Sequence, residues 1–267
     1  MYISVSADLA LVRQFLPISL SELNAKAEML RRRDNKYVIE RPVIQEATED
    51  FIDHFDVLEI GGRRSFTYDT CYFDSPDFEC YRDHHRGRRQ RIKVRIRNYI
   101  ESNLCFVEVK LKDKRGETIK KRLAHDPARS QELDARAMDF VQLCYSSLYK
   151  RQFPHQLERA INMRYKRVTL VAKIGSERMT IDSKLCFMSG SSKQYVGNDK
   201  FIVETKSANG NGIADKVLRS LHRHPSKHCS KYCTATAILN ADVKSNNFKM
   251  VMRKLIPSNH YLNAAMQ

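Results

Sequence analysis

Residues 91–97 read Arg-Ile-Lys-Val-Arg-Ile-Arg, with a basic side chain at every second position. A β-strand points successive side chains to opposite faces, so this stretch predicts a strand with one apolar and one cationic face. Residues 107–112, Val-Glu-Val-Lys-Leu-Lys, repeat the alternation. Two looser examples are Arg32/Asp34/Lys36 and Ile202/Glu204/Lys206. Four cationic strand faces together predict a shared binding site for a polyanion.

The alternative explanation for each strand is a face that meets water, which is the normal state of an antiparallel sheet. For a single strand that explanation is the better one. Charges of one sign repel each other on neighbouring strands, however, so stacked cationic faces are costly unless an anion lies between them. We therefore expect the basic faces to enclose a phosphate-binding interior.

The composition of the chain agrees with a polyanionic partner. In 267 residues, 47 Lys and Arg stand against 31 Asp and Glu, which gives a formal charge of +16. Such a balance favours nucleic acid, phosphorylated ligands or an anionic membrane as partner. No apolar stretch approaches the ~20 residues of a membrane-spanning helix, and the N-terminus lacks the apolar core of a signal peptide. The seven cysteines are scattered and odd in number, so we expect reduced thiols and a cytoplasmic protein without a membrane segment.

Hydrophobic spacing and turn residues predict an α+β fold with one domain over residues 1–267, a core over about 18–235 and a peripheral helix within 236–267. Helices are expected over residues 19–33, 42–55, 134–149, 213–222 and 235–255. Strands are expected over residues 36–39, 65–73, 89–99, 104–111, 118–122, 164–174, 178–187 and 200–206. About eight antiparallel strands with polar inner faces can close into a barrel around a ligand. The expected fold is therefore a closed antiparallel β-barrel with flanking helices.

Short motifs along the chain carry a family resemblance. They are Arg32-x-Asp34-x-Lys36-Tyr37, Tyr68-x-Thr70-x-Tyr72-Phe73-Asp74, Tyr81-x-x-His84-x-x-Gly87, Lys93-Val94-Arg95-x-Arg97-x-Tyr99, Glu108-Val109-Lys110, Lys120-x-Arg122, Tyr165-x-Arg167, Arg178-x-Thr180-Ile181-Asp182, Glu204-x-Lys206 and Ser230-Lys231-Tyr232. Jointly and in this order they resemble the VTC domain, named for the vacuolar transporter chaperone complex. The resemblance covers about residues 18–235.

This resemblance implies a triphosphate-tunnel fold of the CYTH superfamily, an antiparallel barrel whose basic interior grips phosphates together with Mn²⁺ or Mg²⁺. The best-studied VTC domains are polyphosphate polymerases, which transfer the terminal phosphate of ATP to a growing inorganic polyphosphate chain. The implied partners are ATP and polyphosphate. Nucleic acid is not expected, because basic residues that face a closed interior would exclude a duplex. The oligomeric state is left open.

The motifs and the alternation together select the candidate site residues. The candidate catalytic residues are Lys36, Arg95, Arg97, Lys110 and Glu204. The candidate phosphate- or nucleotide-binding residues are Lys93, Lys120, Arg122, Arg167, Arg178, Lys206 and Lys231. Glu204 is the first choice for a metal ligand and Glu108 the second. Fixed cations and a metal stabilise the charge that develops on a moving phosphoryl group, so no covalent protein nucleophile is needed.

Other interpretations of these residues stay open. Lys206 is equally well explained as the ion-pair partner of Glu204, and Glu108 as a counter-charge for its cationic neighbours. His84 and His85 are expected in a basic turn. The His- and Cys-containing stretch at 222–233 lacks the paired spacing of a structural zinc site, so we do not expect zinc there.

Two other functions also fit the sequence. The first is a triphosphatase of the same fold, in which water replaces phosphate as acceptor. Hydrolytic tunnel enzymes usually open with Glu-x-Glu-x-Lys, whereas this chain has Arg32-x-Asp34-x-Lys36, which favours transfer. The second is a non-catalytic module that binds polyphosphate or nucleic acid.

Overall fold

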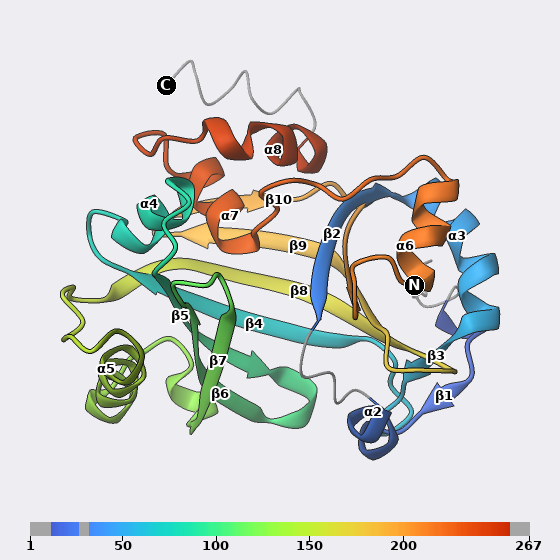
Figure 1. The fold of residues 1–267 in the computed structure, drawn as a ribbon, viewed down its shortest axis with the longest axis horizontal. Helices are drawn as coiled ribbons and strands as arrows, with labels where there is room; N and C mark the ends of the chain where they lie inside the picture. The colour runs from blue at the N-terminus through green and yellow to red at the C-terminus, as the bar shows by residue number, and fades with distance from the viewer. Residues whose placement is uncertain (1–11, 27–31, 257–267) are drawn as a thin grey trace, which may run out of the picture.

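The computed structural model describes residues 12–26 and 32–256, and shows a large, curled antiparallel sheet with helices around it (Figure 1). The strands are β1 (Pro17–Ile18), β2 (Arg33–Glu40), β3 (Phe55–Leu58), β4 (Phe66–Asp74), β5 (Arg91–Tyr99), β6 (Leu104–Lys112), β7 (Thr118–His125), β8 (Glu158–Ala172), β9 (Arg178–Ser189), β10 (Ser192–Tyr195) and β11 (Lys200–Ser207). The α-helices are α2 (Leu20–Lys26), α3 (Arg41–His54), α4 (Glu79–His85), α5 (Ala135–Tyr149), α6 (Ile213–Ser220), α7 (Lys231–Leu239) and α8 (Lys249–Leu255). Short 3₁₀ turns complete the list: η1 (Ile100–Ser102), η2 (Pro127–Arg129) and η3 (Asn246–Phe248).

Eight strands form the main path of the sheet, in the order β2-β11-β9-β8-β4-β5-β6-β7. All neighbours on this path are antiparallel. Three short strands extend it: β3 pairs with β8, β1 with β3 in parallel, and β10 with β9. The eight strands of the path match the eight that the sequence predicts, although β8 begins at Glu158, earlier than expected.

The closed barrel is the part of the predicted fold that the structure does not complete. Strands β2 and β7 end the hydrogen-bonded path, and within the described residues they do not pair with each other. Residues 225–231 meet the free edge of β2 instead. The backbone N–H of Ser226 donates to the carbonyl of Lys36 (2.7 Å), and Nζ of Lys93 on β5 donates to Oγ of Ser230 (2.9 Å). A polar segment therefore bonds to the edge that a closed barrel would pair with another strand.

The outer face of the sheet is apolar and packs on helices. On β5, Ile92, Val94 and Ile96 are buried in one cluster with residues of α5, as the alternation at 91–97 predicts. On β2, Tyr37 and Ile39 pack in a second cluster with residues of α3 and α6. Because the helices cover this face, the basic side chains of the same strands lie on the inner face.

A buried carboxylate holds α4 and α7 against the sheet. Asp74, at the end of β4, accepts hydrogen bonds from the backbone N–H groups of Cys80 (2.8 Å) and Tyr81 (2.9 Å) in α4. It also accepts one from the hydroxyl of Tyr232 in α7. Ser230 caps α7, because its Oγ accepts from the backbone N–H of Cys233 (3.4 Å). These contacts fix the start of α7 beside the inner face of the sheet.

Three expectations about the helices are corrected. The helix expected over 19–33 ends at Lys26 within the described residues; residues 27–31 lie outside them, and β2 begins at Arg33. The helix expected over 235–255 is two helices, α7 and α8, separated by a stretch rich in Asn, Asp and Ser whose side chains compete for backbone hydrogen bonds. The basic turn expected at His84 and His85 is the last turn of α4.

The second half of the expected C-terminal helix lies in the core. Val251, Met252 and Leu255 of α8 are buried in the cluster that also contains residues of α7 and β8. The remainder of the expected peripheral segment, residues 257–267, is outside the described residues. Within residues 12–26 and 32–256, no helix has both the length and the apolar character needed to cross a membrane.

Substitution of Gly212 tests the packing around α6. The carboxylate of Glu177 accepts hydrogen bonds from the backbone N–H groups of Ile213 (2.6 Å) and Ala214 (2.9 Å) at the start of this helix. A Cβ on Gly212 would lie 2.4 Å from the Glu177 carboxyl carbon. We expect Gly212→Ala to lower the free energy of unfolding by about 1–3 kcal/mol, the usual cost of overpacking. Urea unfolding measures this, and an unchanged midpoint would contradict it. In the Glu177→Ala background the penalty should shrink, because the clashing group is gone.

Candidate functional site

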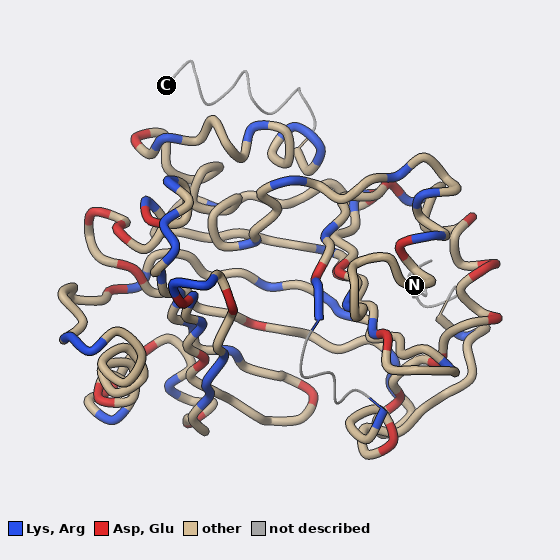
Figure 2. Tube along the Cα trace, in the orientation of Figure 1, with Lys and Arg blue, Asp and Glu red and all other residues tan. Residues whose placement is uncertain are grey.

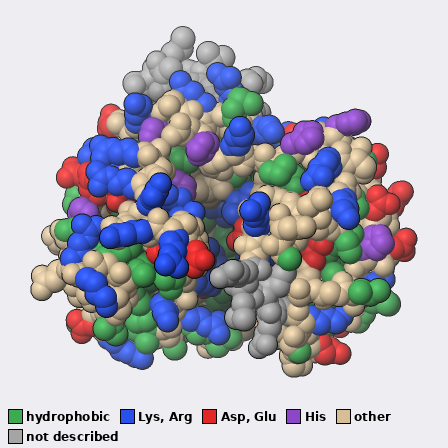
Figure 3. Space-filling view, viewed as in Figure 1, with side chains coloured by type: hydrophobic (Ala, Val, Ile, Leu, Met, Phe, Trp, Pro, Cys, Tyr) green, Lys and Arg blue, Asp and Glu red, His purple; other side chains and the backbone are tan. Residues whose placement is uncertain are grey.

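The inner face of the sheet encloses a cavity of about 630 Å³. Every strand of the eight-strand path contributes to its lining, as does the segment 225–231. Lys and Arg lie on every one of these strands except β4 (Figure 2), and the space-filling view shows a hollow bordered by basic side chains (Figure 3). The basic lining residues are Arg32, Lys36, Arg91, Lys93, Arg95, Arg97, Lys110, Lys120, Arg167, Arg178, Lys206 and Lys231. The acidic lining residues are Asp34 and Glu204.

Strand register places three lysines directly opposite one another. Lys93 of β5 pairs with Lys110 of β6, which pairs with Lys120 of β7. Like charges at directly opposed positions destabilise a sheet. The pKa of Lys110 is held well below its ordinary range by the neighbouring charge of Arg95 and by burial. A bound anion would relieve this repulsion.

Glu108 is the counter-charge for the cations on β5 and β7. It is fully buried, beneath the lining. Its Oε2 lies 2.7 Å from Nε of Arg95 and 3.6 Å from Nη1 of Arg97, and its Oε1 lies 2.5 Å from Nζ of Lys120. Burial opposes ionisation, but these cations outweigh it and hold the pKa of Glu108 far below its usual range. The carboxylate is thus the shared counter-charge of three cations.

A second buried carboxylate orients the cations on the opposite wall. Asp182 of β9 receives a bidentate pair of hydrogen bonds from Arg167, at 2.6 and 2.7 Å, and Nζ of Lys231 lies 2.5 Å from its Oδ2. Burial would raise the pKa of Asp182, but Arg167 and Lys231 more than offset this and lower it. Lys231 enters the cavity from the first turn of α7, and Arg167 enters it from β8.

Tyrosines of the lining support the arginines. The guanidinium of Arg167 lies 4.8 Å from the centre of the Tyr68 ring, and that of Arg97 lies 5.4 Å from it. Arg95 donates a hydrogen bond from Nη1 to the hydroxyl of Tyr72 (2.8 Å). Tyr68 also stacks on Tyr165 (5.3 Å). These rings contact the arginines, and they also line the cavity.

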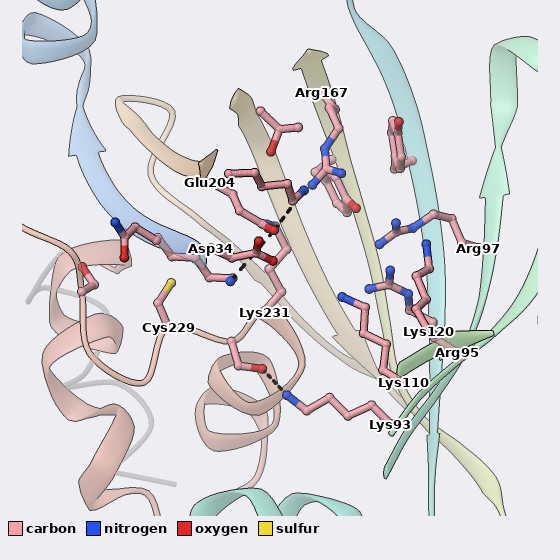
Figure 4. A pocket seen from close by; sticks show the side chains of 18 of the residues that line it. Asp34, Lys93, Arg95, Arg97, Lys110, Lys120, Arg167, Glu204, Cys229 and Lys231 are labelled. Atoms are coloured by element: carbon pink, nitrogen blue, oxygen red, sulfur yellow. Dashed lines mark hydrogen bonds and ion pairs between the residues drawn. The ribbon is translucent and has the colours of Figure 1, made fainter. Parts of the chain in front are cut away.

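Glu204 is the carboxylate that lines the centre of the cavity, where it faces the cations of β5 to β7 (Figure 4). Its Oε1 lies 3.1 Å from Nζ of Lys206 and 4.0 Å from Nζ of Lys36. Burial would raise its pKa, but Lys206, Lys36, Lys231 and Lys110 together hold the pKa well below its usual range. Glu204 is thus an ionised carboxylate on the cavity wall. Lys206 is its ion-pair partner and also a lining residue.

A divalent metal fits this part of the cavity. The described residues hold no cluster of three or more His, Cys, Asp and Glu side chains that could bind a metal by themselves. Thr180 lies directly opposite Glu204 in the sheet, and its Oγ1 is buried without a hydrogen-bond partner in the described structure. Mn²⁺ and Mg²⁺ take oxygen ligands and complete their shells with water and phosphate oxygens. Glu204 and Thr180 supply such oxygens.

The structure brings nearly all the predicted site residues to one cavity. Of the residues selected from the sequence, those on the cavity wall are Lys36, Lys93, Arg95, Arg97, Lys110, Lys120, Arg167, Arg178, Glu204, Lys206 and Lys231. Arg122 and Glu108 are not on the wall. Arg122 lies over the ring of Phe106 (4.9 Å), and Glu108 is beneath the cations. The functional roles of all the selected residues, on the wall or beneath it, stay predictions.

Sequence reasoning missed several residues of the site. Arg91 belongs to the alternating stretch but was not selected as a site residue. It is two residues from Lys93 and so shares its strand face, and both line the cavity. Asp182 belongs to one of the quoted motifs but was not selected as a site residue; it lies within β9 and orients Arg167. Thr180 lies two residues before Asp182 and therefore on the same face of β9. The alternation of side chains along this strand could have identified it as a lining residue. Cys229 and Ser226 come from an irregular segment with no periodic signal.

The fold is an α+β domain in which a curled antiparallel sheet surrounds a cationic cavity. The chain belongs to the VTC domain family, which matches residues 31–240. No curated protein sequence matches it. Two similar solved structures are a Bacillus halodurans protein proposed to be an adenylate cyclase (10% identity, TM-score 0.48, 75% of this chain and 95% of that one) and a proposed adenylyl cyclase of Hippeastrum with a dominant triphosphatase activity (14% identity, TM-score 0.48, 76% and 94%).

Proposed function

We propose that the protein is a metal-dependent polyphosphate polymerase that transfers the terminal phosphate of ATP to a growing inorganic polyphosphate chain. The observation that carries the proposal is the cavity itself, in which cations from every strand of the path except β4 surround the ionised carboxylate of Glu204. Membership in the VTC domain family supports the reaction, because its best-studied members catalyse it. The curled sheet and residues 225–231 together would form the tunnel wall.

In this proposal, cations on two facing walls of the cavity bind the phosphate chain from both sides. Arg95, Arg97 and Lys120, oriented by Glu108, face Arg167 and Lys231, oriented by Asp182. Planar Arg groups give bidentate contacts to phosphate oxygens, and Lys groups give compact point charges. Cations fixed on both sides of the chain hold the attacking and leaving oxygens in line and stabilise the charge that spreads over the transferred group.

The metal and the acceptor complete the reaction scheme. Glu204, with the Thr180 hydroxyl, would hold Mn²⁺ or Mg²⁺, which neutralises phosphate charge when bound. The acceptor is the terminal phosphate of polyphosphate. It is already ionised at neutral pH, so the reaction needs no general base from the protein. ATP and polyphosphate are therefore the expected partners.

The proposal is tested by incubating the pure protein with ATP and Mn²⁺, resolving products on a gel and assaying free phosphate. A polyphosphate ladder is expected. Free phosphate without a ladder would indicate a triphosphatase instead. Salt-sensitive polyphosphate binding with neither product would indicate a binding module and contradict the proposal.

Lys110→Ala separates a phosphate-binding role from a structural one. Lys110 is repelled by Arg95, Arg97 and Lys120, so its removal should leave the melting temperature unchanged or raise it. Polymer formation should nevertheless fall by roughly 100-fold, as when a preorganised charge is removed from an active site. The matched control is Lys121→Ala, one residue from Lys120 on β7 and outside the cavity lining. Equal activity in the two variants would contradict the assignment.

A further inference from the structure

Two basic segments lie at one end of the cavity. Residues 86–91, which lead from α4 into β5, read Arg-Gly-Arg-Arg-Gln-Arg, and residues 112–117, which lead from β6 towards β7, read Lys-Asp-Lys-Arg-Gly-Glu. The first holds four basic residues and the second three, against two acidic residues in all. Because Arg91 is opposite Lys112 in the sheet, both segments leave the same end of the neighbouring strands β5 and β6 (Figures 1 and 2).

A row of like-charged pairs runs from the cavity out to these turns. Three successive pairs, two residues apart on each side, are Lys93/Lys110, Arg91/Lys112 and Arg89/Lys114. The first two are directly opposed in the register of β5 and β6, and the third continues the same spacing into the turns. The first pair lines the cavity, whereas the third is exposed and outside the lining. Opposed like charges repel, so an anion that follows the row from the cavity to the surface would relieve this repulsion.

The charges at the outer end of the row are available to a ligand. Four exposed cations of the turns form no ion pair with any residue in the described ranges: Arg86, Arg89, Lys114 and Arg115. Two nearby carboxylates are engaged elsewhere. Asp83 lies 3.1 Å from Nε of Arg88, and Asp113 accepts a hydrogen bond from the backbone N–H of Glu117 (2.8 Å). We call the four cations the turn surface.

The composition of the two segments favours one kind of polyanion. Neither segment contains an aromatic residue on which a nucleic-acid base could stack, nor a large apolar residue that would enter a lipid surface. A bare phosphate chain needs neither. The row also begins inside the cavity, so an anion that follows it must be thin enough to enter there, which excludes a duplex and a membrane.

We infer that the turn surface binds the part of a polyphosphate chain that extends out of the cavity. The inference rests on the proposed function for the identity of the chain, and it adds a second binding region outside the cavity. A chain held at two linked regions binds more tightly than one held at either region alone. Affinity should therefore rise with chain length, because only a long chain reaches both regions at once.

Calorimetric titration with inorganic tripolyphosphate and with long-chain polyphosphate separates the two regions. The variant carries Arg89→Ala, Lys114→Ala and Arg115→Ala together. We expect it to bind the long chain roughly tenfold more weakly than the wild type, as for the loss of three exposed ion pairs. The slope of log affinity against log salt for the long chain should fall by roughly one for each cation removed. Tripolyphosphate should bind both proteins equally at physiological salt, where exposed charges beyond about 8 Å are screened.

A control variant of equal net charge distinguishes the turn surface from the overall charge of the protein. It carries Arg63→Ala, Arg136→Ala and Lys216→Ala, three exposed positions on other parts of the fold that do not line the cavity. It should bind both ligands as the wild type does. Equal affinity of the two triple variants for the long chain would overturn the inference, as would an equal loss of affinity for tripolyphosphate and the long chain in the turn-surface variant.

Two further measurements separate this inference from the proposed function. With ATP and Mn²⁺, the turn-surface variant should consume ATP at the initial rate of the wild type but release shorter polyphosphate chains. Selective loss of long-chain binding in a protein that makes no polymer would overturn the proposed function and support the turn surface. Competition by a single-stranded oligonucleotide that is as effective as polyphosphate of equal charge would identify nucleic acid as the ligand and overturn the inference.

Discussion

Glu204→Gln is expected to abolish ATP-dependent polymer formation, with a loss of roughly 100-fold or more, the scale seen when one preorganised electrostatic contact is removed from an active site. The substitution keeps the shape of the side chain but removes the charge that would hold a divalent cation. Glu204 is the ionised carboxylate at the centre of the cavity, with Lys206 at 3.1 Å. The rate should also lose its dependence on Mn²⁺ concentration.

Binding and folding separate this role from a structural one. Without metal, Glu204→Gln should bind tripolyphosphate at least as tightly as the wild type, because a negative charge has left an anion site. The matched control is Glu40→Gln, since Glu40 also lies on the β2–β11 pair, 3.7 Å from Lys200, but does not line the cavity. That control should keep its activity. A Glu204→Gln protein that retains polymer formation and its Mn²⁺ dependence would contradict the assignment.

Glu108→Gln is expected to produce the largest loss of stability, about 3–5 kcal/mol, as when one partner of a buried ion network is removed. Three cations, Arg95, Arg97 and Lys120, would then lie together without their shared carboxylate. Tripolyphosphate should restore part of the lost stability, because it supplies the missing negative charge. Urea unfolding with and without tripolyphosphate measures both effects. Glu132→Gln, at an exposed pair with Arg129 (2.7 Å), is the control and should change stability little.

The pH dependence of this difference follows from the lowered pKa of Glu108. A carboxylate whose pKa is lower in the folded protein stabilises the fold above its unfolded-state pKa, about 4.3, and the contribution is lost as pH falls further. The gap in unfolding free energy between wild type and Glu108→Gln should therefore be constant from pH 7 to about pH 5 and shrink below it. A gap that widens on acidification would contradict the burial of an ionised Glu108.

The alternation of successive side chains between the two faces of a strand explains how much of the site could be predicted from the sequence. In residues 91–97 the alternation assigns Arg95 and Arg97 to one face and Val94 and Ile96 to the other, and the structure has them in the cavity and in the core respectively. Which face a side chain lies on depends only on its position within its own strand, so the sequence of one strand is enough to predict it. The same logic placed Lys110 and Glu204 on the wall.

Contacts that depend on register and on irregular segments were not predictable in this way. The pairing of Glu108 with Lys120 requires β6 and β7 to meet in one register, and that of Asp182 with Lys231 joins β9 to α7 across many residues. The edge of β2 is met by residues 225–231, which have no periodicity. Barrel closure was expected from the number of strands, their polar inner faces and the family resemblance, none of which determines whether the two end strands form hydrogen bonds with each other.

The destination of the γ-phosphate of ATP tests the central claim most directly. Incubation of the protein with γ-labelled ATP and Mn²⁺, followed by measurement of ADP, free phosphate and label in polymer, gives a complete phosphate balance. We predict that ADP forms with little free phosphate and that the label is recovered in polyphosphate chains. Equal amounts of ADP and free phosphate, with no label in polymer, would show that water is the acceptor and contradict the account.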